Sequence, residues 1–199
     1  EIKKIHGKHL SYNNYNDIFS ALTISKSLPK NSGTVIVKHA NPCGVSINKD
    51  NLKSYKLALA CDPISAFGGI VSCNHRINKI LAIELNNIFL EVVIANGFDP
   101  EALKILKKKK KLRLIDATNF EIKNLIKFNS SNESILTQSE DLEKFNINDF
   151  KVVSKKKPNK SQLKSLIFAF NVCRYVKSNA IVLVSQEATV GIGSGQPSR

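Results

Sequence analysis

The sequence predicts an α/β protein in which a mainly parallel sheet is covered by helices. Short apolar runs rich in β-branched residues alternate with segments that repeat apolar residues at helical spacing, up to about residue 115. Strands joined by helical crossovers produce this alternation. The chain has 199 residues, of which 42% are apolar, and this is ordinary for a globular domain with a core of its own.

Cap and stop residues mark the expected helices. The first covers residues 17–28 and ends at Pro29, and Asp50 can cap a second one. A third helix is expected near residues 78–87. Residues 99–101, Asp-Pro-Glu, supply a cap, a proline at the first helical position and a first-turn acid for a fourth. The positions of the second helix that should face inward are Leu52, Tyr55 and Leu59.

The expected strands are short apolar runs between these helices, and they cover residues 34–37, 70–72, 91–95, 112–115 and 180–184. The first, the third and the last have the composition of buried strands. These strands and helices follow one another in alternation along the chain, which is the basis of the predicted sheet.

The segment before the last strand contains an irregular region and a strong helix. Residues 117–160 are polar and rich in lysine, with strand patterns near residues 134–137 and 150–153. Ser161 begins the clearest helical pattern of the chain. A single apolar stripe of this helix is expected to face the core, and it consists of Leu163, Leu166, Ile167, Phe170 and Cys173.

The composition argues against several classes of function. The net charge is +14, but nearly all positive residues are lysines and aromatic residues are not interleaved with them, so a nucleic-acid partner is not expected. No apolar run approaches the roughly 20 residues of a membrane span. The four cysteines lack C-x-x-C spacing, and a glycine separates His6 from His9, so no metal site is expected. Reduced thiols fit a cytoplasmic protein.

Lys38 and His39 are the first candidates for chemistry. They follow the apolar run 34–37, and Pro42 and Gly44 are expected to end any regular element there. Ligand sites in α/β sheets form outside the carboxyl ends of strands. A Lys-His pair places a fixed cation beside a base that titrates near neutral pH. Solvated polar residues at a strand end would explain the pair equally well.

Two glycine-rich segments and one asparagine are weaker candidates. Gly68 and Gly69 let the backbone approach a ligand closely, but paired glycines are also common in tight turns. The C-terminal GIGSGQPSR has backbone N–H groups and an arginine that suit phosphate, without matching a Walker A or dinucleotide motif. Asn179 lies between a helix end and a strand, where a simple helix C-cap is the preferred interpretation.

Taken together, four motifs are much more specific. In chain order, VKHANPCGV, CDPISAFGGIV, VKSNAIVLV and TVGIGSGQPSR resemble the transformylase part of the bifunctional purine-biosynthesis family. The resemblance covers essentially the whole chain. It implies a cytidine-deaminase-like three-layer fold, and transfer of a formyl group from 10-formyltetrahydrofolate to the 5-amino group of aminoimidazolecarboxamide ribonucleotide (AICAR). It also implies a homodimer and a second activity, IMP cyclohydrolase, in the complete protein.

The resemblance assigns roles to particular residues. Lys38 and His39 would be catalytic, with His39 as the base and Lys38 facing the negative charge that develops during transfer. Asn179 would be an orienting catalytic group. The expected nucleotide contacts are Gly68, Glu91 and Arg199, with Arg199 on the phosphate. The family's monovalent cation is assigned to no residue.

The chain is expected to be part of a longer protein, because it has no methionine and stops directly after a glycine-rich stretch. Residues 1–199 would be the first subdomain of the transformylase, with an insertion at about 117–160. The cyclohydrolase domain and a second subdomain would lie outside, so these residues alone are expected to be inactive. Two alternatives stay open: a basic nucleic-acid-binding α/β module and an inactive truncated scaffold.

Overall fold

A computed structural model describes residues 2–123, 126–139 and 146–198. The chain divides into two compact units, one formed by Glu1–Phe120 with Pro158–Arg199 and the other by Glu121–Lys157. The smaller unit falls within the segment for which the sequence predicts an insertion. Within the described residues, no helix is long and apolar enough to cross a membrane.

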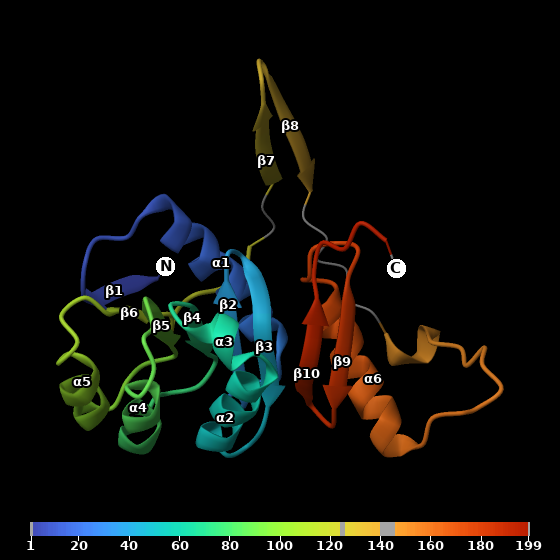
Figure 1. Cartoon of the computed structure of the whole chain (residues 1–199), viewed down its shortest axis with the longest axis horizontal. Helices are drawn as coiled ribbons and strands as arrows, with labels where there is room; N and C mark the ends of the chain where they lie inside the picture. The colour runs from blue at the N-terminus through green and yellow to red at the C-terminus, as the bar shows by residue number, and fades with distance from the viewer. Residues whose placement is uncertain (1, 124–125, 140–145, 199) are drawn as a thin grey trace. The chain divides into compact units, whose positions relative to one another are not determined.

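The larger unit is built on one sheet with the strand order β1-β6-β5-β4-β2-β3-β10-β9 (Figure 1). Its strands are β1 (Lys3–His6), β2 (Gly33–Lys38), β3 (Asn41–Ile47), β4 (Ile70–Cys73), β5 (Val92–Ala95), β6 (Arg113–Asp116), β9 (Ile181–Ser185) and β10 (Ala188–Gly193). Its helices are α1 (Tyr12–Ser27), α2 (Asn51–Cys61), α3 (Pro63–Ala66), α4 (Lys79–Leu85), α5 (Pro100–Leu106) and α6 (Lys160–Cys173).

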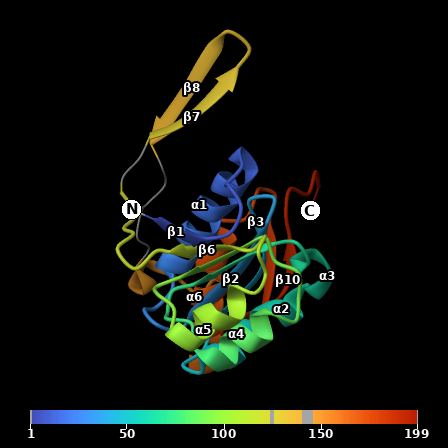
Figure 2. The same cartoon turned by 90° about the vertical axis from the view of Figure 1, so that its left-hand side faces the viewer.

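Alternate residues of the strands enter two cores on opposite faces of this sheet. In β5, Val93 and Ala95 pack in the core that contains residues of α2, α4 and α5, whereas Val92 and Ile94 pack in the core that contains residues of α1 and α6. Figure 2 shows α2, α4 and α5 side by side along the sheet. The predicted three-layer α/β class is confirmed.

The pairing of the strands is mixed. β4, β5 and β6 are parallel, as the alternation of helices and strands predicts, and every other pairing in this sheet is antiparallel. Two of the antiparallel pairs are hairpins: β2 and β3 are joined through His39 and Ala40, and β9 and β10 through Gln186 and Glu187. A two-residue turn can join only antiparallel strands.

The expectation that Pro42 and Gly44 end regular structure is wrong, because both lie inside β3. Pro42 pairs with Val37 at the point where the register shifts, and proline is tolerated at such irregularities. Gly44 lies against α2, where a Cβ atom would stand 1.9 Å from the Ala58 carbonyl oxygen. Its role is therefore close packing between a strand and a helix.

Helix ends were predicted with mixed success. Asp50 caps α2 as expected, accepting hydrogen bonds from the N–H groups of Leu52 and Lys53. Helix α1 begins before residue 17, because Ser11 and Asn14 form a reciprocal capping box. Asp99 precedes α5 but makes no cap bond, since its carboxylate accepts from Arg76 Nε at 2.6 Å instead.

The predicted inward stripe of α6 is wrong in part. The helix buries Phe168 and Val172, whereas Leu166 is 55% exposed and Phe170 is 49% exposed. The helix has apolar residues on more than one side, so helical spacing alone does not select the buried face. The strand β9 is not fully buried either, since Leu183 is 60% exposed. The reason is that β9 is an edge strand, the last in the order of the sheet.

The smaller unit contains a hairpin of β7 (Ile126–Ser131) and β8 (Ser134–Ser139), followed by a short 3-10 helix, Ile147–Asp149. The expected strand near residues 134–137 is confirmed as β8. Residues 150–153, the other expected strand, do not form one.

His75 supports a prediction about stability, because it is a buried histidine two residues after the end of β4. The side chain is 2% exposed, Nδ1 donates to the Arg76 carbonyl oxygen at 3.1 Å, and Nε2 has no hydrogen-bond partner among the described residues. Burial lowers the pKa of His75 below its usual value of 6.5, and the Arg76 carbonyl opposes this only in part.

The free energy of unfolding should therefore fall as the pH drops below 6.5, the ordinary pKa. The unfolded chain takes up a proton there that the folded chain excludes, and the loss is at most about 1.4 kcal/mol per pH unit. Urea unfolding at pH 7.5 and 5.5 measures this loss in the natural sequence and in His75→Gln, which cannot titrate. An equal loss in both proteins would contradict the prediction.

Candidate active site

The described residues predicted to form the site gather at one edge of the sheet. Because β2 is antiparallel to β4, its carboxyl end lies beside the amino ends of β4 and β5, as the pairs Val37–Ile70 and Ile70–Val92 show. Lys38 and Glu91 are next to Val37 and Val92 in the chain, and Gly68 is two residues before Ile70. The site thus lies at the carboxyl end of β2, as predicted, but at the amino ends of the parallel strands.

His39 occupies a strained and well-anchored turn. His39 and Ala40 have φ values of 53° and 58°, in the left-handed region, which costs a non-glycine residue roughly 1–2 kcal/mol. Both backbone groups of Ala40 are held by α1: the N–H donates to Asp17 Oδ1 at 2.7 Å and the carbonyl accepts from Ser20 Oγ at 3.0 Å. The His39 carbonyl accepts from Asn41 Nδ2 at 3.0 Å. The turn presents the His39 side chain to solvent.

Lys38 reaches the glycine loop that precedes β4. Its Nζ donates to the Phe67 carbonyl oxygen at 2.7 Å. The next residue, Gly68, has a φ of 74° and donates its N–H to the Phe89 carbonyl at 2.8 Å. The loop therefore needs glycine for its conformation, and it brings the Lys38 ammonium beside the predicted nucleotide contact.

A cleft of about 430 Å³ opens beside Lys38 and His39. Its other lining residues are Asn41, Pro42, Cys43, Cys61, Asp62, Ser65, Gly191 and Ile192. Burial raises the pKa of Cys43 to about 12 and also raises that of Cys61, so both thiols stay protonated near neutral pH. Hydrogen bonds from Ser65 lower the pKa of Asp62, which keeps this carboxylate ionised. Lys38 and Asp62 are thus the charged side chains that line the cleft, and the His39 imidazole lines it as well.

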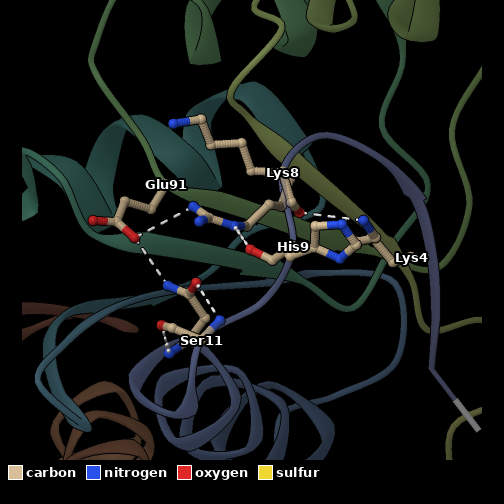
Figure 3. A network of polar contacts seen from close by, with 7 residues as sticks. Lys4, Lys8, His9, Ser11 and Glu91 are labelled. Carbon is tan, nitrogen blue, oxygen red and sulfur yellow. Dashed lines mark hydrogen bonds and ion pairs between the residues drawn. The ribbon is translucent and has the colours of Figure 1, made fainter.

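Glu91 belongs to a second cluster at the same edge (Figure 3). Its Oε2 accepts from Asn14 Nδ2 at 2.9 Å and from Arg113 Nη1 at 3.5 Å. Arg113 Nε in turn donates to the His9 carbonyl oxygen at 3.0 Å. The Glu91 side chain is 42% exposed and that of Arg113 only 15%. The carboxylate is therefore oriented by contacts on its protein side and stays accessible on its solvent side. The Glu91 N–H donates to Gly69, which connects this cluster to the glycine loop.

Asn179 lies beside the glycine-rich stretch. Its Nδ2 donates to the Gln196 carbonyl at 3.0 Å, and its own carbonyl accepts from the Gln196 N–H at 3.1 Å. Ser194, two residues earlier, donates to Asn41 Oδ1 at 2.8 Å, which links this stretch to the His39 turn. Asn179 is no helix cap, since α6 ends at Cys173. Arg199 lies outside the described residues.

Sequence reasoning missed three polar residues of this edge, namely Asn14, Asp17 and Arg113. A signal was available for the first two, because Ser11 and Asn14 have capping-box spacing. A helix that starts there begins earlier than residue 17, and it places Asn14 and Asp17 on neighbouring turns. Nothing in the sequence pairs Arg113 with Glu91, because that contact depends on the strand order.

Comparison with known proteins places this chain in a family. The model of the family described as AICARFT/IMPCHase bienzyme matches residues 1–199. The proteins named bifunctional purine biosynthesis protein PurH from Leptospira biflexa and Rhodospirillum rubrum are 42% and 44% identical to this chain. The first is matched over 100% of this chain and 39% of its own length, and the second over 99% and 38%.

The homologue of the same name from Bacillus mycoides is 42% identical over 99% of this chain and 39% of its own length. The chain therefore spans about two fifths of the length of the curated relatives it matches. With a family match over its whole length and this level of identity, the chain belongs to the AICARFT/IMPCHase bienzyme family.

Proposed function

We propose that the protein containing this chain transfers a formyl group from 10-formyltetrahydrofolate to the 5-amino group of AICAR, a step of purine biosynthesis that leads to IMP. The observation that carries the proposal is the Lys38–His39 pair at a cleft, in a chain of this family. The natural protein would be a cytoplasmic homodimer with IMP cyclohydrolase as its second activity. The site residues named below belong to formyl transfer alone.

The side chains suit the chemistry of the transfer. The AICAR amine is conjugated to an imidazole carboxamide and is a poor nucleophile, so a base must remove its proton as it attacks the formyl carbon. His39 is that base, and Lys38 stabilises the negative oxygen of the tetrahedral centre. The centre collapses by breaking the bond to N10 of the donor, which takes up a proton and leaves as tetrahydrofolate.

The remaining assignments concern positioning and binding. Asn179 orients the reacting groups, and Gly68 and Glu91 contact the nucleotide. Arg199 grips the phosphate, since a planar guanidinium matches phosphate oxygens in two places.

No contact made by the described residues favours the alternative of a nucleic-acid-binding module. Within the lysine-rich run after α5, Lys109 Nζ donates to the carbonyl oxygens of Asn86 and Ile88, so this lysine fixes the end of α4.

The direct test is an assay of the natural-length protein with AICAR and 10-formyltetrahydrofolate. Release of tetrahydrofolate should require the nucleotide, and the product should be formylated on the 5-amino group. A protein that binds AICAR tightly but releases no tetrahydrofolate above background would contradict formyl transfer and favour the scaffold alternative.

Residues 1–199 alone should show no sustained turnover. Holding amine and formyl carbon in reacting geometry supplies roughly 7–11 kcal/mol in favourable cases. The chain spans only 39% of its relatives' length, and we expect most folate contacts to lie outside it. Mixing the purified chain with both substrates and following tetrahydrofolate tests this. Turnover above background that His39→Ala abolishes would show that these residues suffice.

A further inference from the structure

Helix α1 contacts both the Glu91 cluster and the turn that carries His39, through side chains at three-residue spacing. Asn14 Nδ2 donates to Glu91 Oε2 at 2.9 Å. Asp17 Oδ1 accepts the Ala40 N–H at 2.7 Å, and Ser20 Oγ donates to the Ala40 carbonyl at 3.0 Å. Other residues of α1 are fully buried in the core that α1 shares with α6, so the helix is a firmly packed support for these contacts.

The turn that carries His39 depends on these contacts. Lys38 pairs with Asn41, so the backbone groups of Ala40 lie beyond the β2–β3 ladder and need other partners. Asp17 and Ser20 supply both. Turns with two left-handed residues favour asparagine and glycine, and this one contains histidine and alanine. Its conformation is therefore maintained from outside, and loss of the Asp17 contact would let the turn relax and move His39.

The Glu91 carboxylate is held in a comparable way. Asn14 is 5% exposed, and both ends of its amide are used: Nδ2 donates to Glu91 and Oδ1 accepts from the Ser11 N–H at 3.1 Å. The amide cannot turn without losing both bonds. Together with Arg113, it aims one oxygen of Glu91 toward the protein.

We propose that Asp17 and Asn14 are positioning residues of this site, Asp17 for the turn that carries His39 and Asn14 for the Glu91 carboxylate. The inference rests on the proposed formyl transfer, in which His39 is the base and Glu91 binds the nucleotide. Neither Asp17 nor Asn14 is a catalytic residue, since each acts through another group. The two should affect different steps: Asp17 the chemical step, and Asn14 nucleotide binding.

The test of Asp17 compares two substitutions in the natural-length protein. Asp17→Ala removes the acceptor, and it should lower kcat about tenfold to a hundredfold while KM for AICAR changes less than about threefold. Asp17→Asn keeps an oxygen that accepts the Ala40 N–H, and it should restore most of kcat. Asn16→Ala is the matched control, because Asn16 is exposed on the same helix. If Asp17→Asn is as slow as Asp17→Ala, the negative charge itself is needed and positioning is refuted.

The test of Asn14 uses aspartate. Asn14→Asp keeps the oxygen that accepts the Ser11 N–H. Its second carboxylate oxygen, however, faces the Glu91 carboxylate, and the two negative groups repel each other. KM for AICAR should rise about tenfold or more, and kcat should change little. Should the Asp17 and Asn14 variants change kcat and KM in the same proportion, α1 would merely support the fold and the inference would be wrong.

One readout is independent of the reaction. Hydrogen exchange of the Ala40 amide should become at least about tenfold faster in Asp17→Ala and stay unchanged in Asn16→Ala. If the natural-length protein is active and Ala40 exchange is unchanged in Asp17→Ala, the Asp17 contact is refuted. If Ala40 exchange is faster in Asp17→Ala but the unsubstituted natural-length protein transfers no formyl group, the proposed function is refuted and the Asp17 contact stays established.

Discussion

His39→Ala is expected to lower kcat of formyl transfer by about a hundredfold or more, with little change in AICAR affinity. The exposed ring lies at the edge of the cleft, beside Lys38, and it is the group assigned to remove the proton of the attacking amine. Its loss leaves the Lys38 cation and the glycine loop in place, so nucleotide binding should persist. Steady-state kinetics with both substrates, together with calorimetric titration of AICAR, measure the two quantities separately.

The matched variant is His39→Asn. Asparagine tolerates positive φ better than most residues, so it preserves the turn while lacking a base near neutral pH. It should be as slow as His39→Ala. Lys30→Ala, an exposed change outside the cleft, should leave kcat unchanged. An asparagine variant with near-normal kcat would show that His39 shapes the turn and is not the base.

The sequence predicted the strand before Lys38 and His39 better than the direction in which that strand runs. Lys38 and His39 could be located because a β-branched apolar run ends directly before them, and this local pattern does not depend on the rest of the chain. The run is β2, and it ends at Lys38. The buried strands 70–73 and 92–95 were recognisable for the same reason.

The direction of β2 could not be predicted in this way. Alternating helices and strands favour parallel pairing, but a hairpin through two non-glycine residues, His39 and Ala40, gives no sequence signal. That hairpin, with the antiparallel pairing of β2 and β4, is what brings Lys38 beside the Gly68 loop and Glu91. Pairing of this kind is decided by tertiary packing, which periodicity does not report.

The outward residues of α6 and β9 show a second limit. Helical spacing identified α6 correctly, but Leu166 and Phe170 are about half exposed although they are as apolar as the buried Phe168 and Val172. Apolar content indicates which residues prefer to be buried, and the surroundings present in this chain decide which of them are.

Gly44→Ala should be strongly destabilising, lowering the free energy of unfolding by on the order of 3 kcal/mol. An alanine Cβ at this position would stand 1.9 Å from the Ala58 carbonyl oxygen and 2.8 Å from its carbonyl carbon. Both are backbone atoms of α2, so no side chain can rotate away and the whole helix must move off β3. Cys43 and Pro42, which precede Gly44 in β3, line the cleft, so this movement should also widen the site.

Urea unfolding at neutral pH, followed by circular dichroism, measures the loss. Gly193→Ala is the control, because its Cβ would meet nothing closer than 3.8 Å. Both variants change the unfolded chain in the same way, so the difference between them reports the folded state. The expected result is a much lower urea midpoint for Gly44→Ala and a nearly unchanged one for Gly193→Ala. Equal midpoints would mean that α2 and β3 separate at little cost, and that Gly44 is not required for their close packing.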